Sequence, residues 1–406
     1  MTSITPTTAP WGALPVLFIG HDASRAGAPI ALLHFMHWYQ ANIGGPISCL
    51  LIRGGDLEQE FRAICQTTVM ENDGWQPRSI RRRIMKKAGL DGIGRQLHAR
   101  SVAPRNLKNY RLIFYNTLDT SEALELPYSS ESRFLCYVHE LETCIRTYIG
   151  LREARRILDR GDRVVACSNA TAENLIRNHG LHREKVDVVH ESVLVSALAG
   201  KAQEENRQWL RTKLNVGANS IIVGGCGRLG WIKGSDLFVQ MAAVVTSMAP
   251  EIAIHYVWLG GSPESEEGVK FEHDVRKCGL ENRITLISSQ PDPMRYFQAM
   301  DVFVLTSRED PYPLVCLEAA ACAIPIICFD GAGGMPEFVQ SDCGRIVPYL
   351  DIRGLATAVA SFARDSERRR QTGANARTKV MERHDIGVIG PQLLRAMQNA
   401  MEASPI

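Results

Sequence analysis

The chain has 406 residues, of which 45% are hydrophobic and 22% are charged, and its formal net charge is +2. This length is too great for one ordinary core and fits two domains of about 200 residues, and the composition is typical of soluble globular proteins. The near-neutral charge excludes a general polyelectrolyte role, and no apolar run reaches the about 18 residues that cross a bilayer.

Residues 1–12 are expected to be a disordered lead-in. They have no basic start and no apolar core, so they do not resemble a secretory signal. The 11 cysteines form no C-x-x-C pair and most lie in apolar runs, which favours small buried side chains in a reducing cytosol. A metal site is not expected, because His34 and His37 share a helix without a second pair of ligands. The sequence thus predicts a cytoplasmic protein.

Residues 13–195 are predicted to form a first domain of alternating strands and helices. A strand at 16–20 leads through a turn around Gly27 into a helix, as in many α/β nucleotide-binding domains, although a plain strand-to-helix connection would look the same. His139 directly follows a predicted strand, at the edge where open α/β sheets bind ligands. The other predicted strands lie at 47–52, 112–115, 134–138, 164–167 and 186–189, with a helix at 170–178.

The segment from Arg78 to Arg111 contains 11 Lys or Arg residues against one acidic residue, Asp91. Ile80, Ile84 and Ala88 form a narrow apolar stripe in its densest part. A basic amphipathic helix suits an anionic membrane surface, where each basic side chain contributes about 1 kcal/mol. A solvated face with a few ion pairs is the alternative. Nucleic acid is disfavoured, because no nucleic-acid motif accompanies the charge.

A polar stretch at 196–217 is expected to be the domain junction, with a helix at 204–214. Residues 218–384 again alternate between strands and helices, which predicts a second parallel sheet. Residues 385–406 are expected to return to the first domain through a helix from Pro391 to Met401. In the second domain the predicted strands lie at 221–225, 255–259, 284–287, 302–305, 326–329 and 345–347, and the predicted helices at 235–248, 266–278 and 352–362, with another beginning at Pro313.

Two cations follow the glycine-rich end of the strand at 221–225. Gly227 permits a tight turn there, and Arg228 and Lys233 precede the helix at 235–248. Two cations beside a helix N-terminus form an anion site, so this turn is a candidate for binding phosphate groups.

The stretch from 301 to 337 places acidic residues on neighbouring elements. Asp310 follows a predicted strand, and the first amides of the next helix, near Leu314 and Val315, can hold a phosphate. Glu318 lies about two turns further along, where it can accept hydrogen bonds from two ribose hydroxyls. An ordinary helix cap followed by a solvated glutamate would have the same spacing.

Together these stretches resemble the retaining GT-B glycosyltransferases of family four, the relatives of bacterial glycogen synthase and of phosphatidylinositol mannosyltransferases. The residues in register with the three motifs of that family are Ser307, Asp310, Glu318 and Ala319, then Gly333, Gly334, Pro336 and Glu337, and finally Gly227, Arg228, Lys233 and Gly234. Two positions depart from the pattern, because Asp310 stands where Glu is usual and Pro313 stands where Gly is usual.

The resemblance implies an α/β protein of the GT-B type, with two Rossmann-like domains facing each other across a cleft. It implies transfer of a hexose-type sugar, with retention and without a metal, from a UDP or GDP donor. The acceptor would be a glycan or lipid-linked sugar in surface polysaccharide or glycolipid synthesis. Alternatives that remain open are a GT-B epimerase, a phosphorylase, or a non-catalytic protein that binds sugar nucleotides.

The resemblance also implies roles for individual residues. His139 would face the donor sugar and Asp310 would orient its hydroxyls, while Arg228 and Lys233 would hold the diphosphate, so these four are the candidate catalytic residues. The candidate nucleotide-binding residues are Gly27, Gly227, Arg228, Lys233, Leu314, Val315 and Glu318.

Overall fold

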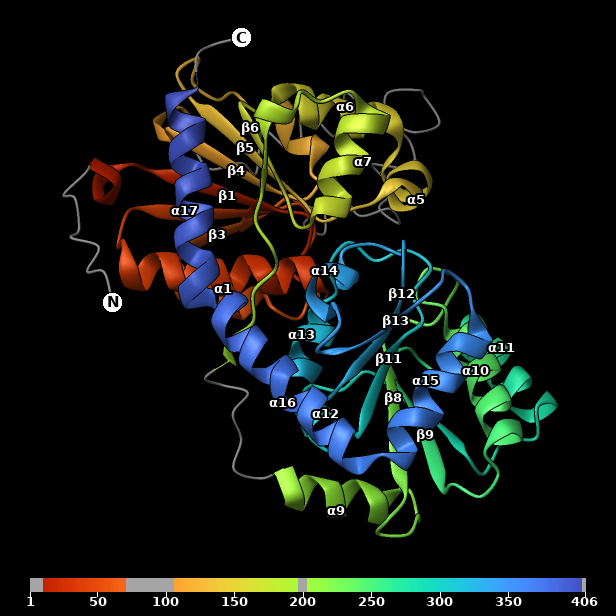
Figure 1. Ribbon diagram of the computed structural model, residues 1–406. Coiled ribbons are helices and arrows are strands. Elements are labelled where there is room, and N and C mark those ends of the chain that lie inside the picture. The colour runs from red at the N-terminus through yellow and green to blue at the C-terminus, as the bar shows by residue number, and fades with distance from the viewer. Residues whose placement is uncertain (1–9, 71–105, 196–202, 404–406) are drawn as a thin grey trace. The chain divides into compact units, whose positions relative to one another are not determined.

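The computed structural model describes residues 10–70, 106–195 and 203–403 of the chain (Figure 1). It divides into two compact units, one formed by Met1–His190 with Ile386–Ile406 and the other by Glu191–Asp385. The expected lead-in and most of the basic segment lie outside the described residues. Within the described ranges, no helix combines the length and the apolar character needed to cross a membrane.

The first unit is built on a seven-stranded parallel sheet with the order β3-β2-β1-β4-β5-β6-β7. The central strands β1 and β4 are buried along their whole length, as expected for apolar runs in a parallel sheet whose two faces are covered. The bounds are β1 Val16–Gly20, β2 Ile47–Leu51, β3 Gln66–Val69, β4 Leu112–Asn116, β5 Arg133–Val138, β6 Arg163–Ala166 and β7 Val186–Val188.

Two helices of the first unit come from opposite ends of the chain. Figure 1 shows α17 (Ile386–Glu402, blue) beside α1 (Gly27–Asn42, red), and the two helices are in contact. Gly390 permits this approach, since a Cβ there would lie 2.3 Å from Cδ2 of Trp38. The other helical segments are α2 Glu58–Ile64, α5 Glu142–Cys144, a π-helical turn Ile145–Ile149, α6 Leu151–Arg160 and α7 Asn169–His179, with short 3-10 turns at Pro10–Ala13, Leu107–Asn109, Ser121–Glu125 and Arg183–Lys185.

The second unit contains a six-stranded parallel sheet with the order β10-β9-β8-β11-β12-β13. Its strands are β8 Ile221–Cys226, β9 Ile254–Leu259, β10 Ile284–Ile287, β11 Val302–Leu305, β12 Ile326–Phe329 and β13 Gly344–Val347. Its helices are α9 Gln203–Lys213, α10 Ser235–Met248, α11 Glu266–Lys277, α12 Met294–Phe297, α13 Leu314–Ala321, α14 Met335–Val339, α15 Ile352–Arg364 and α16 Ser366–Arg383. The prediction of two Rossmann-like parallel sheets is therefore confirmed.

Three helices differ from the sequence prediction. Helix α9, expected in the junction, packs within the second unit, where Leu210 is buried and Arg211 donates to Asp301 at 2.8 Å. Helix α16 was not predicted, since only a few of its positions are buried. Helix α17 begins at Ile386 rather than at Pro391, because close packing on α1 outweighs the cost of a proline in its second turn.

Candidate functional site

In the second unit, the loop after β8 depends on glycines. Gly227 has a φ of +147°, and its carbonyl accepts a hydrogen bond from Nε1 of Trp258 at 3.0 Å. Gly234, with a φ of +65°, leaves no room for a side chain, because a Cβ there would lie 2.0 Å from the carbonyl oxygen of Thr306. These contacts hold the loop that carries Arg228 and Lys233 in one conformation.

Lys233 and Asp310, both predicted from sequence, are in direct contact. Nζ of Lys233 lies 2.6 Å from Oδ2 of Asp310, and Oγ of Ser307 donates to the same oxygen at 2.9 Å. Asp310 is only 4% exposed, and its backbone N–H donates to the carbonyl of Ala332 at 2.7 Å. A buried carboxylate thus fixes the ammonium group at the end of the sheet.

The start of α13 lies in the same loop as Asp310. Leu314 and Val315 are its first two residues, and no side chain in the described part of the chain caps this end. Pro313 precedes the helix as its N-cap, with a ψ of 120°, rather than occupying the first helical position as predicted. Either position suits a residue that has no N–H, so the first amides of α13 still point out of the helix start.

Glu318 lies in the second turn of α13 and is half-buried. Burial raises its pKa to about 7. Burial also raises the pKa of the Cys226 thiol to about 12, and the charges of Glu318 and Lys233 both act on that thiol. The end of β8 is therefore within electrostatic reach of both predicted ligand-binding residues, which places them around one strand end.

Arg228 is exposed in the same loop, and among the described residues it makes no ion pair or hydrogen bond.

A second arginine, Arg308, organises the loop, and it was not predicted from the sequence. It donates through two nitrogens to Asp236, at 2.7 and 2.9 Å, and to the carbonyl of Trp231 at 2.9 Å. No spacing rule links Arg308 to Asp236, so only the folded chain reveals this contact.

In the first unit, the two predicted residues follow strands β1 and β5, which flank β4 in the sheet. Gly27 begins α1, whose N-cap Ala26 makes no side-chain cap. His139 directly follows β5, and its Nε2 lies 3.0 Å from Oδ1 of Asn116, the last residue of β4. Nδ2 of Asn116 donates to the carbonyl of Ala28 at 2.9 Å. Asn116, which was not predicted from the sequence, thus connects His139 to Ala28, the residue after Gly27.

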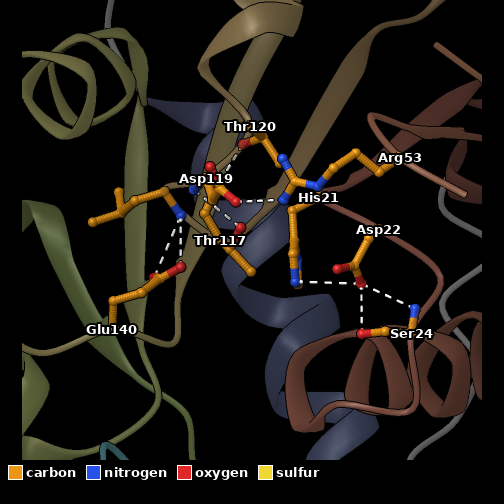
Figure 2. Close-up of polar contacts among 9 residues, drawn as sticks. His21, Asp22, Ser24, Arg53, Thr117, Asp119, Thr120 and Glu140 are labelled. Atoms are coloured by element: carbon orange, nitrogen blue, oxygen red, sulfur yellow. Dashed lines mark hydrogen bonds and ion pairs between the residues drawn. The ribbon is translucent and has the colours of Figure 1, made fainter. Parts of the chain in front are cut away.

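More polar side chains gather at the same strand ends (Figure 2). Arg53, after β2, donates to Asp119 at 2.5 Å, and His21, after β1, lies 3.4 Å from Oδ1 of Asp22. Burial lowers the pKa of His21, which favours its neutral form. None of these was predicted, yet each follows a strand, and that position was the available signal.

Glu140 is a buried acid at this edge. Its carboxylate accepts the backbone N–H of Leu118 at 3.2 Å (Figure 2). It also accepts the backbone N–H of His139 at 2.9 Å, so it links the ends of β4 and β5. Burial raises its pKa to about 7, although the charge of His139 and these N–H groups act against that rise.

Two family models match the chain. The model "Glycosyltransferase Family 4" matches residues 59–194, and the model "Glycosyl transferases group 1" matches residues 206–379, so that together they cover about three quarters of the sequence.

Among curated proteins, the chain is 25% identical over 230 residues to D-inositol 3-phosphate glycosyltransferase of Corynebacterium kroppenstedtii, covering 55% of this chain and 50% of that one. It is 28% identical over 260 residues to 2-deoxystreptamine N-acetyl-D-glucosaminyltransferase of Streptomyces fradiae, covering 63% and 58%. The chain thus spans about half the length of the curated relatives it matches.

Solved structures share the architecture over nearly the whole chain. HepE of Anabaena in complex with UDP-glucose aligns with a TM-score of 0.75 at 20% identity, covering 95% of this chain and 99% of that one. Sucrose-phosphate synthase of Thermosynechococcus elongatus aligns with a TM-score of 0.71 at 20% identity, covering 96% and 100%. At these identities the likeness establishes the fold.

Proposed function

This chain belongs to family four of the GT-B glycosyltransferases, and we propose that it transfers a hexose-type sugar, with retention, from a nucleotide-diphosphate donor to a hydroxyl of an acceptor. The observation that carries the proposal is the contact between Lys233 and Asp310 beside the uncapped start of α13. A fixed cation and free helix amides are what a diphosphate leaving group requires.

The proposed donor site lies in the second unit. The diphosphate rests against Lys233, Arg228 and the amides of Leu314 and Val315, while Glu318 accepts from the ribose hydroxyls. Charge builds on the leaving oxygen as the bond to the sugar breaks, and preplaced cations stabilise that charge without reorganising. Because side-chain cations fill this role, we propose that transfer needs no metal ion.

We propose UDP as the nucleotide, with GDP as the alternative. HepE, which shares the fold, was solved with UDP and with UDP-glucose, and this supports a uridine donor for the present chain. Asp310 then orients sugar hydroxyls, and His139 of the first unit is the further catalytic residue of the proposal. The acceptor is a glycan or lipid-linked sugar, in surface polysaccharide or glycolipid synthesis.

The proposed place of action is the cytoplasmic face of a membrane. The support is the run of basic residues at 78–111, of which the described part retains Lys108 and Arg111. Binding to anionic vesicles that weakens with salt is the expected result, and equal binding to neutral vesicles would remove this part of the proposal.

The test of function is a transfer assay with UDP- and GDP-hexoses and a pool of glycan and lipid-linked acceptors, with and without a chelator. We expect nucleotide release that depends on the acceptor, and a product with the anomeric configuration of the donor. Sugar conversion without an acceptor, a need for inorganic phosphate, or nucleotide binding without turnover would each contradict the proposal.

A further inference from the structure

A hollow lies at the edge of the sheet in the second unit. Strand β13, at one end of that sheet, contacts both α15 and α16 (Figure 1). Residues between 345 and 368, from these three elements and the loop before α15, line a space of about 490 Å³, which we call the β13–α15 hollow. A volume of about 300–1,000 Å³ is typical of small-molecule sites. None of the residues that line it belongs to the candidate donor site, so the hollow is a separate feature of this unit.

Small side chains of α15 leave room for the β13–α15 hollow. Gly354, Ala358 and Ser361 recur at helical spacing, so they share one face of the helix, and all three line the hollow. Ile346 of β13 lines it as well, and Phe362, which is only 2% exposed, adds an aromatic ring. The hollow is therefore formed by two regular elements that contact each other.

Three arginines from three different elements line this hollow. Arg345 lies on β13, Arg353 in the first turn of α15 and Arg368 in the first turn of α16. Among the described residues, none of the three has an ion pair. Arg364 and Arg370, on the same two helices but outside the hollow, each pair with a glutamate. A cleft lined by one sign of charge attracts the opposite charge, so the three arginines indicate an anionic ligand.

One acidic residue, Asp351, is present among the described residues that line the hollow. Its Oδ1 accepts the backbone N–H of Gly354 at 2.8 Å, so this carboxylate caps α15. Three arginines against one carboxylate leave the lining with a formal charge of +2. A phosphate monoester carries about −1.5 to −2 at pH 7, and the guanidinium fork matches the geometry of its oxygens. The hollow therefore matches a phosphate monoester in charge.

Hydroxyl groups supply the uncharged polar part of the lining. Oγ of Ser361 accepts from Nη1 of Arg368 at 3.2 Å, and that guanidinium lies 5.3 Å from the Phe362 ring centroid. Oγ1 of Thr357 donates to the carbonyl of Arg353 at 2.8 Å. Within the described chain, the Ser361 proton and the Thr357 lone pairs remain available to a ligand. Both suit a molecule that carries hydroxyl groups beside its phosphate.

We propose that the β13–α15 hollow binds a small phosphate monoester that carries hydroxyl groups. Its phosphate contacts Arg345, Arg353 and Arg368, and its hydroxyls contact Thr357 and Ser361. Two sources offer this chemistry, a free polyol or sugar phosphate and the phosphomonoester headgroup of a membrane lipid. The site does not depend on the proposed transfer reaction, because no residue of the donor site takes part.

Isothermal titration calorimetry on the full chain tests the binding. sn-Glycerol 3-phosphate is the soluble probe and glycerol is the uncharged control, while vesicles of phosphatidylcholine with and without phosphatidic acid test the lipid source. We expect glycerol 3-phosphate, or the vesicles with phosphatidic acid, to bind with a Kd of about 1 mM or lower, and the two uncharged controls not to bind. The probe that binds identifies the source, and binding to neither phosphate probe would overturn the proposal.

Paired variants locate the binding, because the basic residues at 78–111 also attract anions. Arg345→Gln combined with Arg353→Gln should weaken binding of the phosphate probe by about tenfold or more, since two charge-assisted contacts are lost. Arg364→Gln combined with Arg370→Gln removes the same charge outside the hollow and should change the affinity by less than about twofold. Equal losses in the two pairs would mean that general surface charge attracts the probe, and the proposal would fail.

Thr357→Trp tests the hollow itself. Thr357 is exposed and lines the hollow, so a larger side chain there should fill the space while the fold and every charge are kept. The phosphate probe should again bind about tenfold more weakly or worse, because the ring occupies the volume that the ligand needs. Urea unfolding and UDP affinity should remain those of the wild type. Unchanged affinity for the probe would place the ligand elsewhere and overturn the proposal, and weaker UDP binding would contradict the separation of the two sites.

Discussion

In the second unit a cation meets a carboxylate, with Nζ of Lys233 2.6 Å from Asp310, whereas in the first unit an amide meets an imidazole, with Oδ1 of Asn116 3.0 Å from His139. Both contacts lie beyond the carboxyl ends of parallel strands, so the fold offers the same place twice. The chemistry differs because the proposed tasks differ. A leaving diphosphate needs fixed positive charge, which acts over distance, while an attacking or bound hydroxyl needs directional hydrogen bonds.

The first unit also contains charged pairs, but they are more exposed than the Lys233–Asp310 pair of the second unit. Arg53 and Asp119 are about a third exposed or more, so solvent screens their attraction and the pair contributes little. Asp310, by comparison, is 5% exposed at its side chain, which makes its contact with Lys233 sensitive to loss of either partner.

The largest expected effect comes from removing the cation of the second unit. Lys233→Ala should lower kcat/KM by about 100- to 1,000-fold, the usual cost of losing one group that stabilises a leaving oxygen. Since this leaves the Asp310 carboxylate buried without its cation, Lys233→Gln serves as the variant that keeps a donor but no charge. Lys270→Ala, which removes an exposed lysine paired with Glu266 and Glu267, is the matched control and should stay active. Near-normal activity of Lys233→Gln would show that charge at this loop is not needed.

The sequence revealed the charged region because its signals are local. Glycines at 227 and 234 bracket Arg228 and Lys233 within eight residues, and α10 was predicted with the bounds 235–248 that it has. Direct contact between Lys233 and Asp310 was not predicted, since the two residues are 77 positions apart.

The neutral region was largely invisible in the sequence. His139 was found through a resemblance and its place after a strand, but Asn116 bonds to residues 88 and 23 positions away, and no spacing rule links them. From the sequence, Glu140 cannot be told apart from any other acidic residue that follows a strand. Its burial and its two N–H donors become known only from the folded chain. Directional hydrogen bonds between distant segments are decided by packing, and this is why the structure was needed to find them.

The second largest effect should come from the loop that presents the cation. Gly234→Ala combines a φ of +65° with a Cβ 2.0 Å from the Thr306 carbonyl, whereas Gly279→Ala has a φ of +67° and nothing within 4 Å. Gly279→Ala is therefore the control, and it should lower the free energy of unfolding by about 1–2 kcal/mol from backbone strain alone. Gly234→Ala should cost at least about 2 kcal/mol more, measured by urea unfolding monitored by circular dichroism. Equal losses would mean that the loop is not held rigidly.

A smaller effect is expected in the first unit, where the protonation of Glu140 should make the free energy of unfolding depend on pH. Because the pKa of Glu140 is raised to about 7, the folded protein holds a proton that the unfolded chain releases near pH 4.5, so stability should fall as pH rises from about 5 to 8. The contribution of this group is at most about 3.5 kcal/mol, at about 1.4 kcal/mol per pKa unit. Glu140→Gln should reduce the slope in urea unfolding, and Glu173→Gln, at an exposed site of α7, should not. An unchanged slope in Glu140→Gln would show that this carboxyl is ionised in the folded protein.

The smallest effect concerns the competition for Lys233. In the free protein the Asp310 carboxylate accepts hydrogen bonds from Ser307 and from Lys233. An incoming diphosphate would compete with this carboxylate for the Lys233 ammonium group. Asp310→Asn keeps a hydrogen-bonding side chain but removes the competing charge, so UDP should bind about fivefold more tightly, equivalent to about 1 kcal/mol. Isothermal titration calorimetry measures this change, and Glu267→Gln, which weakens an unrelated lysine pair, should leave UDP affinity as it is.

Transfer by the same variant should move in the opposite direction. Asp310 is proposed to orient the donor sugar, so Asp310→Asn should lower kcat while nucleotide affinity rises. This split is specific to a carboxylate that both restrains the cation and contacts the sugar. Weaker UDP binding together with lower kcat would instead mean that the placement of Lys233 by Asp310, on which the proposed donor site rests, matters more for binding than the competition for its charge.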